Sequence, residues 1–229
     1  MSNAMWCDHL DQWMKEIRPL NTHVMRLRPD RACLLVIDMQ NEFLKEEGSI
    51  FFHYATEIVP NIGSMLRAAR KAAIPVVFTG HTHANPQVDG GLTAEWWPEI
   101  KKGKCLIEGT KGVEVYRGLR PIKDEKLVWK HRYSAFYNTD LEITLRGMKV
   151  TDLIITGVLT NVCCESTARD AFFRDFRVFF VADATAATEP EFHVASLKNL
   201  AYAFAYITTT RQILAEIGRP SLRRPRHHP

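Results

Sequence analysis

Six short apolar runs alternate along this chain with longer segments of helical spacing, and this alternation constrains the fold more than any other feature. The runs cover residues 32–37, 75–79, 127–129, 153–156, 177–182 and 203–207. Short continuous apolar runs of this kind are typical of parallel strands that are buried on both faces. The sequence therefore predicts an α/β fold with three layers, α/β/α, around a six-stranded, largely parallel, Rossmann-like sheet.

The fourth run leads directly into a turn and a helix. Gly157 ends the run, and Thr160 and Asn161 are residue types that favour a helix N-cap. Cys163 and Cys164 then fall in the first helical turn, at the carboxyl end of a strand, where open α/β sheets bind ligands. Unpaired N–H groups and the helix dipole favour a thiolate there. Either cysteine could be a nucleophile, and either could instead fill the core.

Further polar residues follow the predicted strands at the same edge of the sheet, namely Asp38, His81, His83 and Lys130. A carboxylate can take the proton of a thiol, and a nearby ammonium stabilises a thiolate. Each residue alone could be an ordinary cap, a solvated side chain or a packing residue. Their convergence at one edge predicts a nucleophilic site made of Asp38, Lys130 and one of the two cysteines.

The length and composition fit one globular domain. The chain has 229 residues, of which 46% are apolar, and a formal net charge of +4. We place one domain at 28–218, after a start that resembles a cloning tag and a peripheral amphipathic helix, both within 1–27. A basic, Pro- and Arg-rich tail at 219–229 is expected to be disordered. Because much of the positive charge lies in that tail, neither nucleic acid nor a membrane is an expected partner.

The cysteines indicate the cellular compartment, and the lack of nucleotide-binding motifs bears on the cofactor. The five cysteines are too few and too scattered for a disulfide scaffold, which favours a reducing, cytoplasmic compartment. No glycine-rich dinucleotide or phosphate loop is present, so no cofactor is expected. No segment approaches the length of a membrane span.

Three blocks of the sequence resemble the signatures of the isochorismatase-like cysteine hydrolases. The blocks are residues 36–43 (VIDMQNEF), 130–136 (KHRYSAF) and 157–171 (GVLTNVCCESTARDA). They occur in the order and at the spacing of that family, and the resemblance extends from about residue 32 to 217. The family includes nicotinamidases, N-carbamoylsarcosine amidohydrolases, ureidoacrylate hydrolases and isochorismatases. The resemblance implies an isochorismatase-type fold and a hydrolase that cleaves the C–N bond of a small amide, ureido or carbamoyl substrate.

The resemblance also implies roles for individual residues. The nucleophile of the family follows Thr-Asn-Val, which here is Cys163, so the implied triad is Asp38, Lys130 and Cys163. Family members carry a non-proline cis peptide before the nucleophile, here Val158–Leu159. The implied oxyanion hole consists of the backbone N–H groups of Leu159 and Cys163. Cys163 would attack the carbonyl and form a thioester that water then hydrolyses.

The sequence constrains the substrate and the pocket residues less than it constrains the triad. Aromatic and amide side chains near the blocks are the predicted substrate-binding residues: Gln40, Asn41, Phe43, Trp96, Trp97, Tyr133, Phe136 and Tyr137. The third block is closest to that of the ureidoacrylate hydrolases. Alternatives are an isochorismatase-type hydrolase of vinyl ethers and a non-catalytic binding relative. Relatives commonly form oligomers, so a homodimer or homotetramer is expected.

The sequence also raises the question whether His81 and His83 bind a metal. Nicotinamidases bind a metal through an Asp-x-His pair where this chain has His81 and His83. Residues 85–89 add no third histidine. We therefore expect no metal, and the departure argues against nicotinamidase activity.

Overall fold

Six strands form one sheet in the order β3-β2-β1-β4-β5-β6, and every neighbouring pair is parallel. The structure is a computed structural model that describes residues 6–219, so the tag-like start and most of the basic tail lie outside the described residues. The strands are β1 Ala32–Ile37, β2 Val76–His81, β3 Lys126–Lys130, β4 Asp152–Val158, β5 Arg177–Ala186 and β6 Tyr206–Thr208. The predicted α/β class and six-stranded sheet are confirmed.

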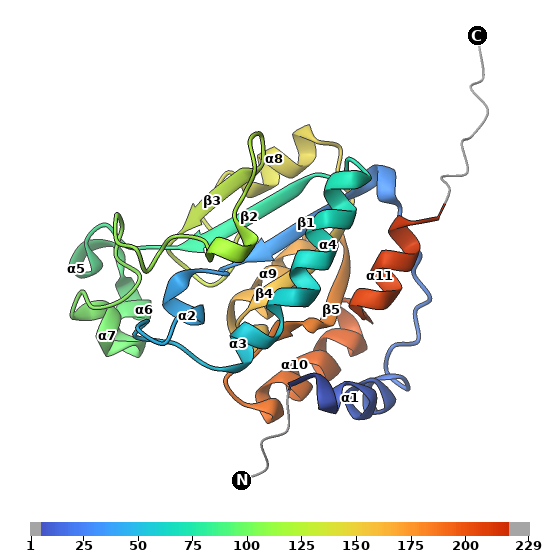
Figure 1. The fold of residues 1–229 in the computed structure, drawn as a ribbon, viewed down its shortest axis with the longest axis horizontal. Coiled ribbons are helices and arrows are strands. Elements are labelled where there is room, and N and C mark those ends of the chain that lie inside the picture. The colour runs from blue at the N-terminus through green and yellow to red at the C-terminus, as the bar shows by residue number, and fades with distance from the viewer. Residues whose placement is uncertain (1–5, 220–229) are drawn as a thin grey trace.

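Helices cover both faces of this sheet (Figure 1). They are α1 Leu10–Ile17, α2 Asn41–Leu44, α3 Tyr54–Glu57, α4 Val59–Lys71, α5 Pro86–Asp89, α6 Gly91–Trp96, α7 Pro98–Lys101, α8 Leu141–Gly147, α9 Glu165–Phe172, α10 Pro190–Ala203 and α11 Thr210–Ile217. Helices α4 and α11 pack together over β5 in front of the sheet, whereas α9 packs against β5 and α10 from the other side.

The strand order reverses between β1 and β4. From β1 the chain runs outward through β2 to β3, then crosses back to β4 and runs outward through β5 to β6. Open α/β sheets bind ligands at the carboxyl ends of the strands beside such a reversal. The topology therefore places a binding site where β1 and β4 end.

The end of β4 differs from the sequence-based expectation. Gly157 was predicted to end the strand, but β4 continues through it to Val158, with a register shift against β5 between Ile155 and Gly157. Gly157 has a φ of 114°, and a Cβ there would lie 2.0 Å from the carbonyl oxygen of Ile37. Only glycine fits at this close approach of β4 to β1, so Gly157 shapes the strand end and does not end it.

The N-terminal segment is more deeply integrated than a peripheral helix. Trp6 is completely buried, and its indole Nε1 donates to the carbonyl of Thr185 at 3.0 Å. Its ring contacts the rings of Trp13, Tyr54 and His193. The side chains of Trp6, Trp13 and Ile17 are therefore part of the core, whereas residues 18–26 are exposed or half-buried.

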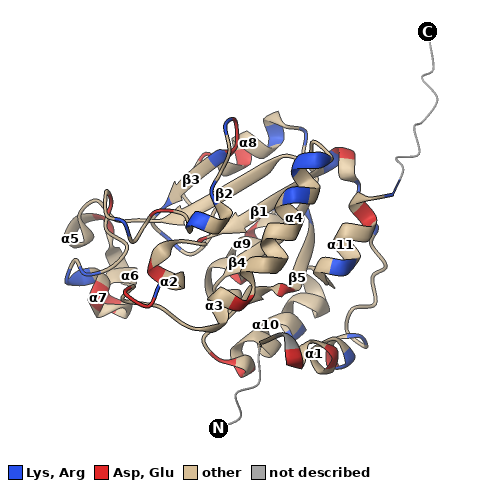
Figure 2. Ribbon diagram, in the orientation of Figure 1, with Lys and Arg blue, Asp and Glu red and all other residues tan. Residues whose placement is uncertain are grey.

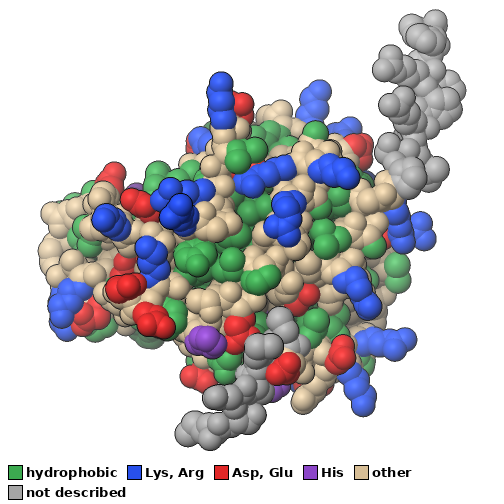
Figure 3. Space-filling view, viewed as in Figure 1, with side chains coloured by type: hydrophobic (Ala, Val, Ile, Leu, Met, Phe, Trp, Pro, Cys, Tyr) green, Lys and Arg blue, Asp and Glu red, His purple; other side chains and the backbone are tan. Residues whose placement is uncertain are grey.

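Charged residues lie on helices and loops around the apolar sheet (Figure 2). Basic and acidic side chains are both spread over the face in view in Figure 3, with apolar side chains between them. Within residues 6–219, no helix combines the length and apolar character that crossing a membrane requires.

Candidate active site

Asp38 directly follows β1 and is completely buried. Its φ of 50° places a non-glycine residue in the left-handed region, which is uncommon and turns the side chain out of the strand pattern. Thr79 in β2 holds it there, because the Thr79 hydroxyl donates to Asp38 Oδ1 at 2.6 Å and accepts from the Asp38 N–H at 3.2 Å. Thr79 was not among the predicted site residues. Its signal in the sequence is a polar residue inside an apolar strand.

Lys130 ends β3 and also is completely buried. Its Nζ lies 2.6 Å from Asp38 Oδ2 and donates to Cys163 Sγ at 3.4 Å and to the carbonyl of Arg132 at 3.1 Å. Burial acts to lower the pKa of this ammonium, but the neighbouring Asp38 and Cys163 raise it above its ordinary value. Lys130 is therefore a permanent cation that links the acid to the thiol.

Cys163 lies in a π-helical turn, Thr160–Cys164, between β4 and α9. The peptide bond Val158–Leu159, directly before this turn, is cis, at the position that the resemblance indicates. Burial raises the pKa of the Cys163 thiol to about 12 although Lys130 acts to lower it. A raised pKa favours the protonated form, so nucleophilic attack calls for a base that takes the thiol proton.

The two adjacent cysteines have different surroundings. Cys163 lines a cavity and contacts Lys130, whereas Cys164 is completely buried and lines neither that cavity nor the recess beside it. Burial raises the pKa of the Cys164 thiol well above its ordinary value. The geometry favours Cys163 as the nucleophile and a packing role for Cys164.

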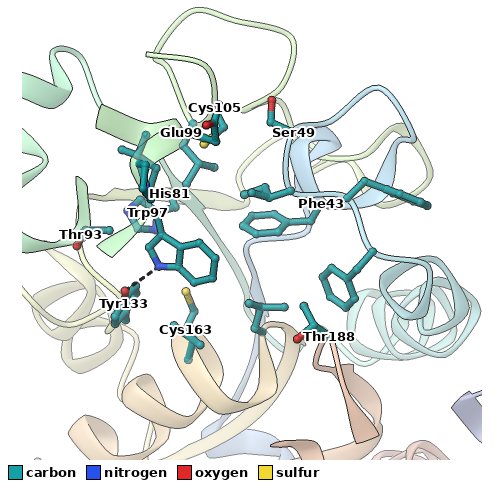
Figure 4. A pocket seen from close by; sticks show the side chains of 18 residues that line it. Phe43, Ser49, His81, Thr93, Trp97, Glu99, Cys105, Tyr133, Cys163 and Thr188 are labelled. Carbon is teal, nitrogen blue, oxygen red and sulfur yellow. Dashed lines mark hydrogen bonds between the residues drawn. The ribbon is translucent and has the colours of Figure 1, made fainter. Parts of the chain in front are cut away.

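A cavity of about 350 Å³ opens above Cys163 (Figure 4). Of the predicted substrate-binding residues, Phe43, Trp97 and Tyr133 line it. The indole Nε1 of Trp97 donates to the Tyr133 hydroxyl at 3.0 Å, which joins the α6–α7 connection to the segment after β3. Figure 4 shows this pair on one side of Cys163 and Phe43 on the other. The segment 84–112, which has few regular signals in the sequence, supplies much of this wall.

Five predicted substrate-binding residues do not line the cavity. The Gln40 amide is completely buried and is engaged by backbone groups of His81 and Val113, and Asn41 donates to the carbonyl of Lys111. Phe136 is buried against Phe176. Trp96 and Tyr137 lie at a neighbouring surface recess. Sequence proximity to a signature block did not reveal these side-chain directions, because they depend on backbone turns that follow each strand.

His81 and His83 occupy different environments. His81 ends β2 next to Lys130, lines the cavity and is 2% exposed. Burial, together with the charge of Lys130, holds its pKa well below its ordinary value, so its imidazole is neutral. His83 Nδ1 instead lies 2.9 Å from Asp89 Oδ1.

Two groups of side chains bring possible metal-ligand atoms within 4.8 Å of one another. One is Asp38, His81 and Cys163, and the other is His83, Asp89 and His131. His131, from the segment after β3, is the third histidine that residues 85–89 lack. In the second group, however, Asp89 already pairs with His83 and accepts two backbone N–H groups, and His131 Nδ1 contacts the carbonyl of Thr82. Internal hydrogen bonds thus account for this arrangement.

Comparison with known proteins gives consistent matches. The isochorismatase domain family matches residues 32–212. Nicotinamidase 3 of Arabidopsis thaliana is 40% identical over 77% of this chain and 83% of its own length. A ureidoacrylate amidohydrolase of Serratia proteamaculans is 31% identical over 88% of this chain and 89% of its own. Among solved structures, a cysteine hydrolase from Pseudomonas syringae pv. phaseolicola has a TM-score of 0.80 and 33% identity, covering 85% of this chain and 95% of that one.

Proposed function

Since this chain belongs to the isochorismatase family, we propose that it is a cysteine-dependent hydrolase that cleaves a C–N bond of a small amide, ureido or carbamoyl substrate. The relatives named as nicotinamidase and ureidoacrylate amidohydrolase support amidohydrolase chemistry. One observation carries the proposal: Lys130 Nζ lies 2.6 Å from Asp38 Oδ2 and 3.4 Å from Cys163 Sγ, beneath a cavity that a small molecule can enter.

In the proposed first half-reaction, Asp38 takes the thiol proton while Cys163 Sγ bonds to the carbonyl carbon. Because the pKa of this thiol is raised, proton removal accompanies attack and no thiolate accumulates beforehand. The carbonyl oxygen becomes an oxyanion, for which the N–H groups of Leu159 and Cys163 are the proposed donors. Asp38 then returns the proton to the departing nitrogen as the C–N bond breaks, leaving a thioester.

The second half-reaction uses the same groups. Asp38, again a carboxylate, takes a proton from water as the water oxygen attacks the thioester carbonyl. The C–S bond then breaks, and the thiol regains its proton. Lys130 stays charged throughout and fixes the orientation of the carboxylate. A vinyl-ether hydrolase would need Asp38 but no thiol, so the placement of Cys163 favours C–N cleavage over that alternative.

The setting of the enzyme is part of the proposal. Cys33, Cys105, Cys163 and Cys164 are all free thiols, which supports a reducing, cytoplasmic compartment. The substrate is a small molecule, as the dimensions of the cavity suggest. Assembly into a homodimer or homotetramer stays a prediction.

A matched pair of cysteine substitutions tests the nucleophile. Cys163→Ala is expected to lower kcat/KM by at least about 10³-fold, measured as ammonia release from a panel of amides, ureides and carbamoyl compounds. Cys164→Ala, its neighbour in the same turn, is the control and retains most of the activity. Wild-type activity in Cys163→Ala would exclude the proposed mechanism.

A further inference from the structure

The lining of the cavity above Cys163 is largely apolar and aromatic. Aromatic side chains form much of its wall: Phe43, Phe51, Phe52, Trp97 and Tyr133. No lysine or arginine is among its lining residues, and the charged side chain that lines it is Glu99. A carboxylate brought into such a wall loses its hydration without gaining a counter-ion, which is unfavourable.

The cations nearest to the cavity are already engaged. Lys130 directs its ammonium to the Asp38 carboxylate, the Arg132 carbonyl and Cys163 Sγ, which occupies its three donors. Lys102 and Lys104 pair with Glu99 at 2.7 and 3.3 Å.

Two other basic groups near the cavity place no cation in its wall. Arg132 keeps its charge, but it donates to the carbonyls of Asp89 and His131 and lines the neighbouring recess instead of this cavity. The buried His81 imidazole, whose Nε2 has no hydrogen-bond partner, reaches the cavity, but it is uncharged. It can therefore form a neutral hydrogen bond with a bound molecule and cannot neutralise an anion.

We propose that this site selects uncharged amides that carry an aromatic or branched apolar group, and that it rejects amides that carry a carboxylate. This proposal rests on the proposed function and defines its substrate class. Ureidoacrylate is itself a carboxylate, so the proposal separates this chain from the relatives named after that substrate, despite the similar third block. The difference in substrate class comes from the wall of the cavity, because the proposed Asp38, Lys130 and Cys163 site could act on both charged and uncharged amides.

An isosteric pair of amides tests this selection. The compounds are 3-nitrobenzamide and 3-carbamoylbenzoate, whose meta substituents have nearly the same shape and differ by one negative charge. With the full chain, ammonia release from 3-nitrobenzamide is expected to exceed that from 3-carbamoylbenzoate by at least about 100-fold in kcat/KM. A ratio near one, or a preference for the carboxylate, would overturn the proposal.

A substitution that adds the missing cation sharpens the test. Ile50 lines the cavity and is partly exposed, so Ile50→Lys can be accommodated while its ammonium reaches the cavity. We expect the ratio between the two amides to fall at least about tenfold in this variant. Ile143→Lys is the matched control, since Ile143 is 78% exposed on α8 and lines neither of the two cavities described above; its ratio should equal that of the wild type. An equal fall in both variants would contradict a role for the cavity wall.

Binding to the Cys163→Ala variant distinguishes failure of this proposal from failure of the proposed function. If calorimetry detects binding of 3-nitrobenzamide but not of 3-carbamoylbenzoate, the selection stands even if the wild type hydrolyses neither compound. The proposed hydrolysis is wrong only if the wild type also releases no ammonia from any of the amides, ureides and carbamoyl compounds in the panel. If the carboxylate binds as tightly as the nitro compound, or neither binds, the proposed substrate class is wrong whatever the wild type hydrolyses.

Discussion

Asp38 and Asp152 are both completely buried, and they lie at opposite ends of the neighbouring strands β1 and β4. Asp152 begins β4 at the amino edge of the sheet, and Asp38 follows β1 at the carboxyl edge. Each carboxylate is paired with basic side chains from distant parts of the chain. The two sites differ in how completely those partners occupy the carboxylate oxygens.

Asp152 is saturated with hydrogen bonds. It accepts from the backbone N–H, Nε and Nη2 of Arg28, from Nη1 of Arg177, and from the Thr151 hydroxyl. It lines neither of the cavities described above. The guanidinium groups keep partial contact with water, so the site joins the segment before β1 to β4 and β5 at a modest desolvation cost.

Asp38 has a sparser environment beside the residue that lines the cavity. The Thr79 hydroxyl, the Lys130 ammonium and the Cys163 thiol contact its carboxylate, and Cys163 in turn lines the cavity. The comparison teaches that burial alone does not separate a structural ion pair from a catalytic one. A saturated carboxylate stabilises the fold, whereas a carboxylate with unused capacity next to a cavity can exchange a proton with a substrate.

The largest expected effect is the loss of activity at Asp38. Asp38→Asn removes the group that takes the thiol proton, so kcat/KM is expected to fall by about 10²–10⁴-fold. The double variant Asp38→Asn/Lys130→Met removes both buried charges and should be at least as stable as the wild type in urea unfolding, because a buried ion pair rarely outweighs its own desolvation. Near-normal activity in Asp38→Asn would remove the distinction between the two carboxylates.

The second effect is a loss of stability at Asp152. Asp152→Asn is expected to lower the free energy of unfolding by about 3 kcal/mol, the low end for a broken buried pair, because both guanidinium groups reach water. Activity per folded molecule should change less than about threefold. Asp140→Asn, which breaks an exposed pair with Lys126, is the control and should cost under about 1 kcal/mol. Equal losses in the two variants would contradict the structural role of Asp152.

A smaller effect is expected on the pH dependence of the free energy of unfolding, through the buried side chain of His193. Burial lowers the pKa of His193, which contacts Thr160 at the start of the nucleophile turn, to about 3. The unfolded chain therefore binds the proton first, so this stabilising contribution is complete above about pH 6.5 and is lost as the pH falls toward 3. Lowering the pH from 7 to 5 should therefore reduce the free energy of unfolding by about 2 kcal/mol through His193. His193→Asn should remove this slope from the unfolding measurements, and an unchanged slope would assign it to other groups.

The smallest effect is expected at Thr79, which positions Asp38. Thr79→Val removes the hydroxyl that donates to Asp38 Oδ1, so kcat/KM is expected to fall about tenfold, the value of one hydrogen bond to a charged group. Thr79→Ser keeps the hydroxyl and should restore most of the activity with an unchanged KM. Equal activity in the Val and Ser variants would show that packing, rather than this hydrogen bond, matters at Thr79.

The sequence predicts the catalytic edge because the prediction needs only strand order along the chain and parallel pairing. Asp38 and Lys130 follow or end a strand, Cys163 lies in the turn after one, and parallel strands bring such ends together. The resemblance to a known family then distinguishes Cys163 from Cys164, which periodicity alone does not.

The wall of the cavity was predicted less well, and the reasons are physical. Gln40 and Asn41 are adjacent to Asp38 in the sequence, yet a backbone φ of 50° at Asp38 redirects the chain, and both amides bind backbone groups. Trp96 and Trp97 are neighbours, but only Trp97 faces the cavity, because α6 ends between them. Side-chain direction in short helices and turns depends on tertiary contacts that no local pattern encodes.

By itself, the sequence determined the α/β class, the edge at which we propose the chemistry and the residue types that we propose for it, because parallel strands have a strong local signature. Only the tertiary structure decided which side chains surround the thiol and which cations are already paired. Those features depend on contacts between residues far apart in the chain, such as Thr79 with Asp38 and Trp97 with Tyr133. The proposed reactive group can thus be predicted from the strand ends, whereas its proposed selectivity depends on the packing of segment 84–112 over them.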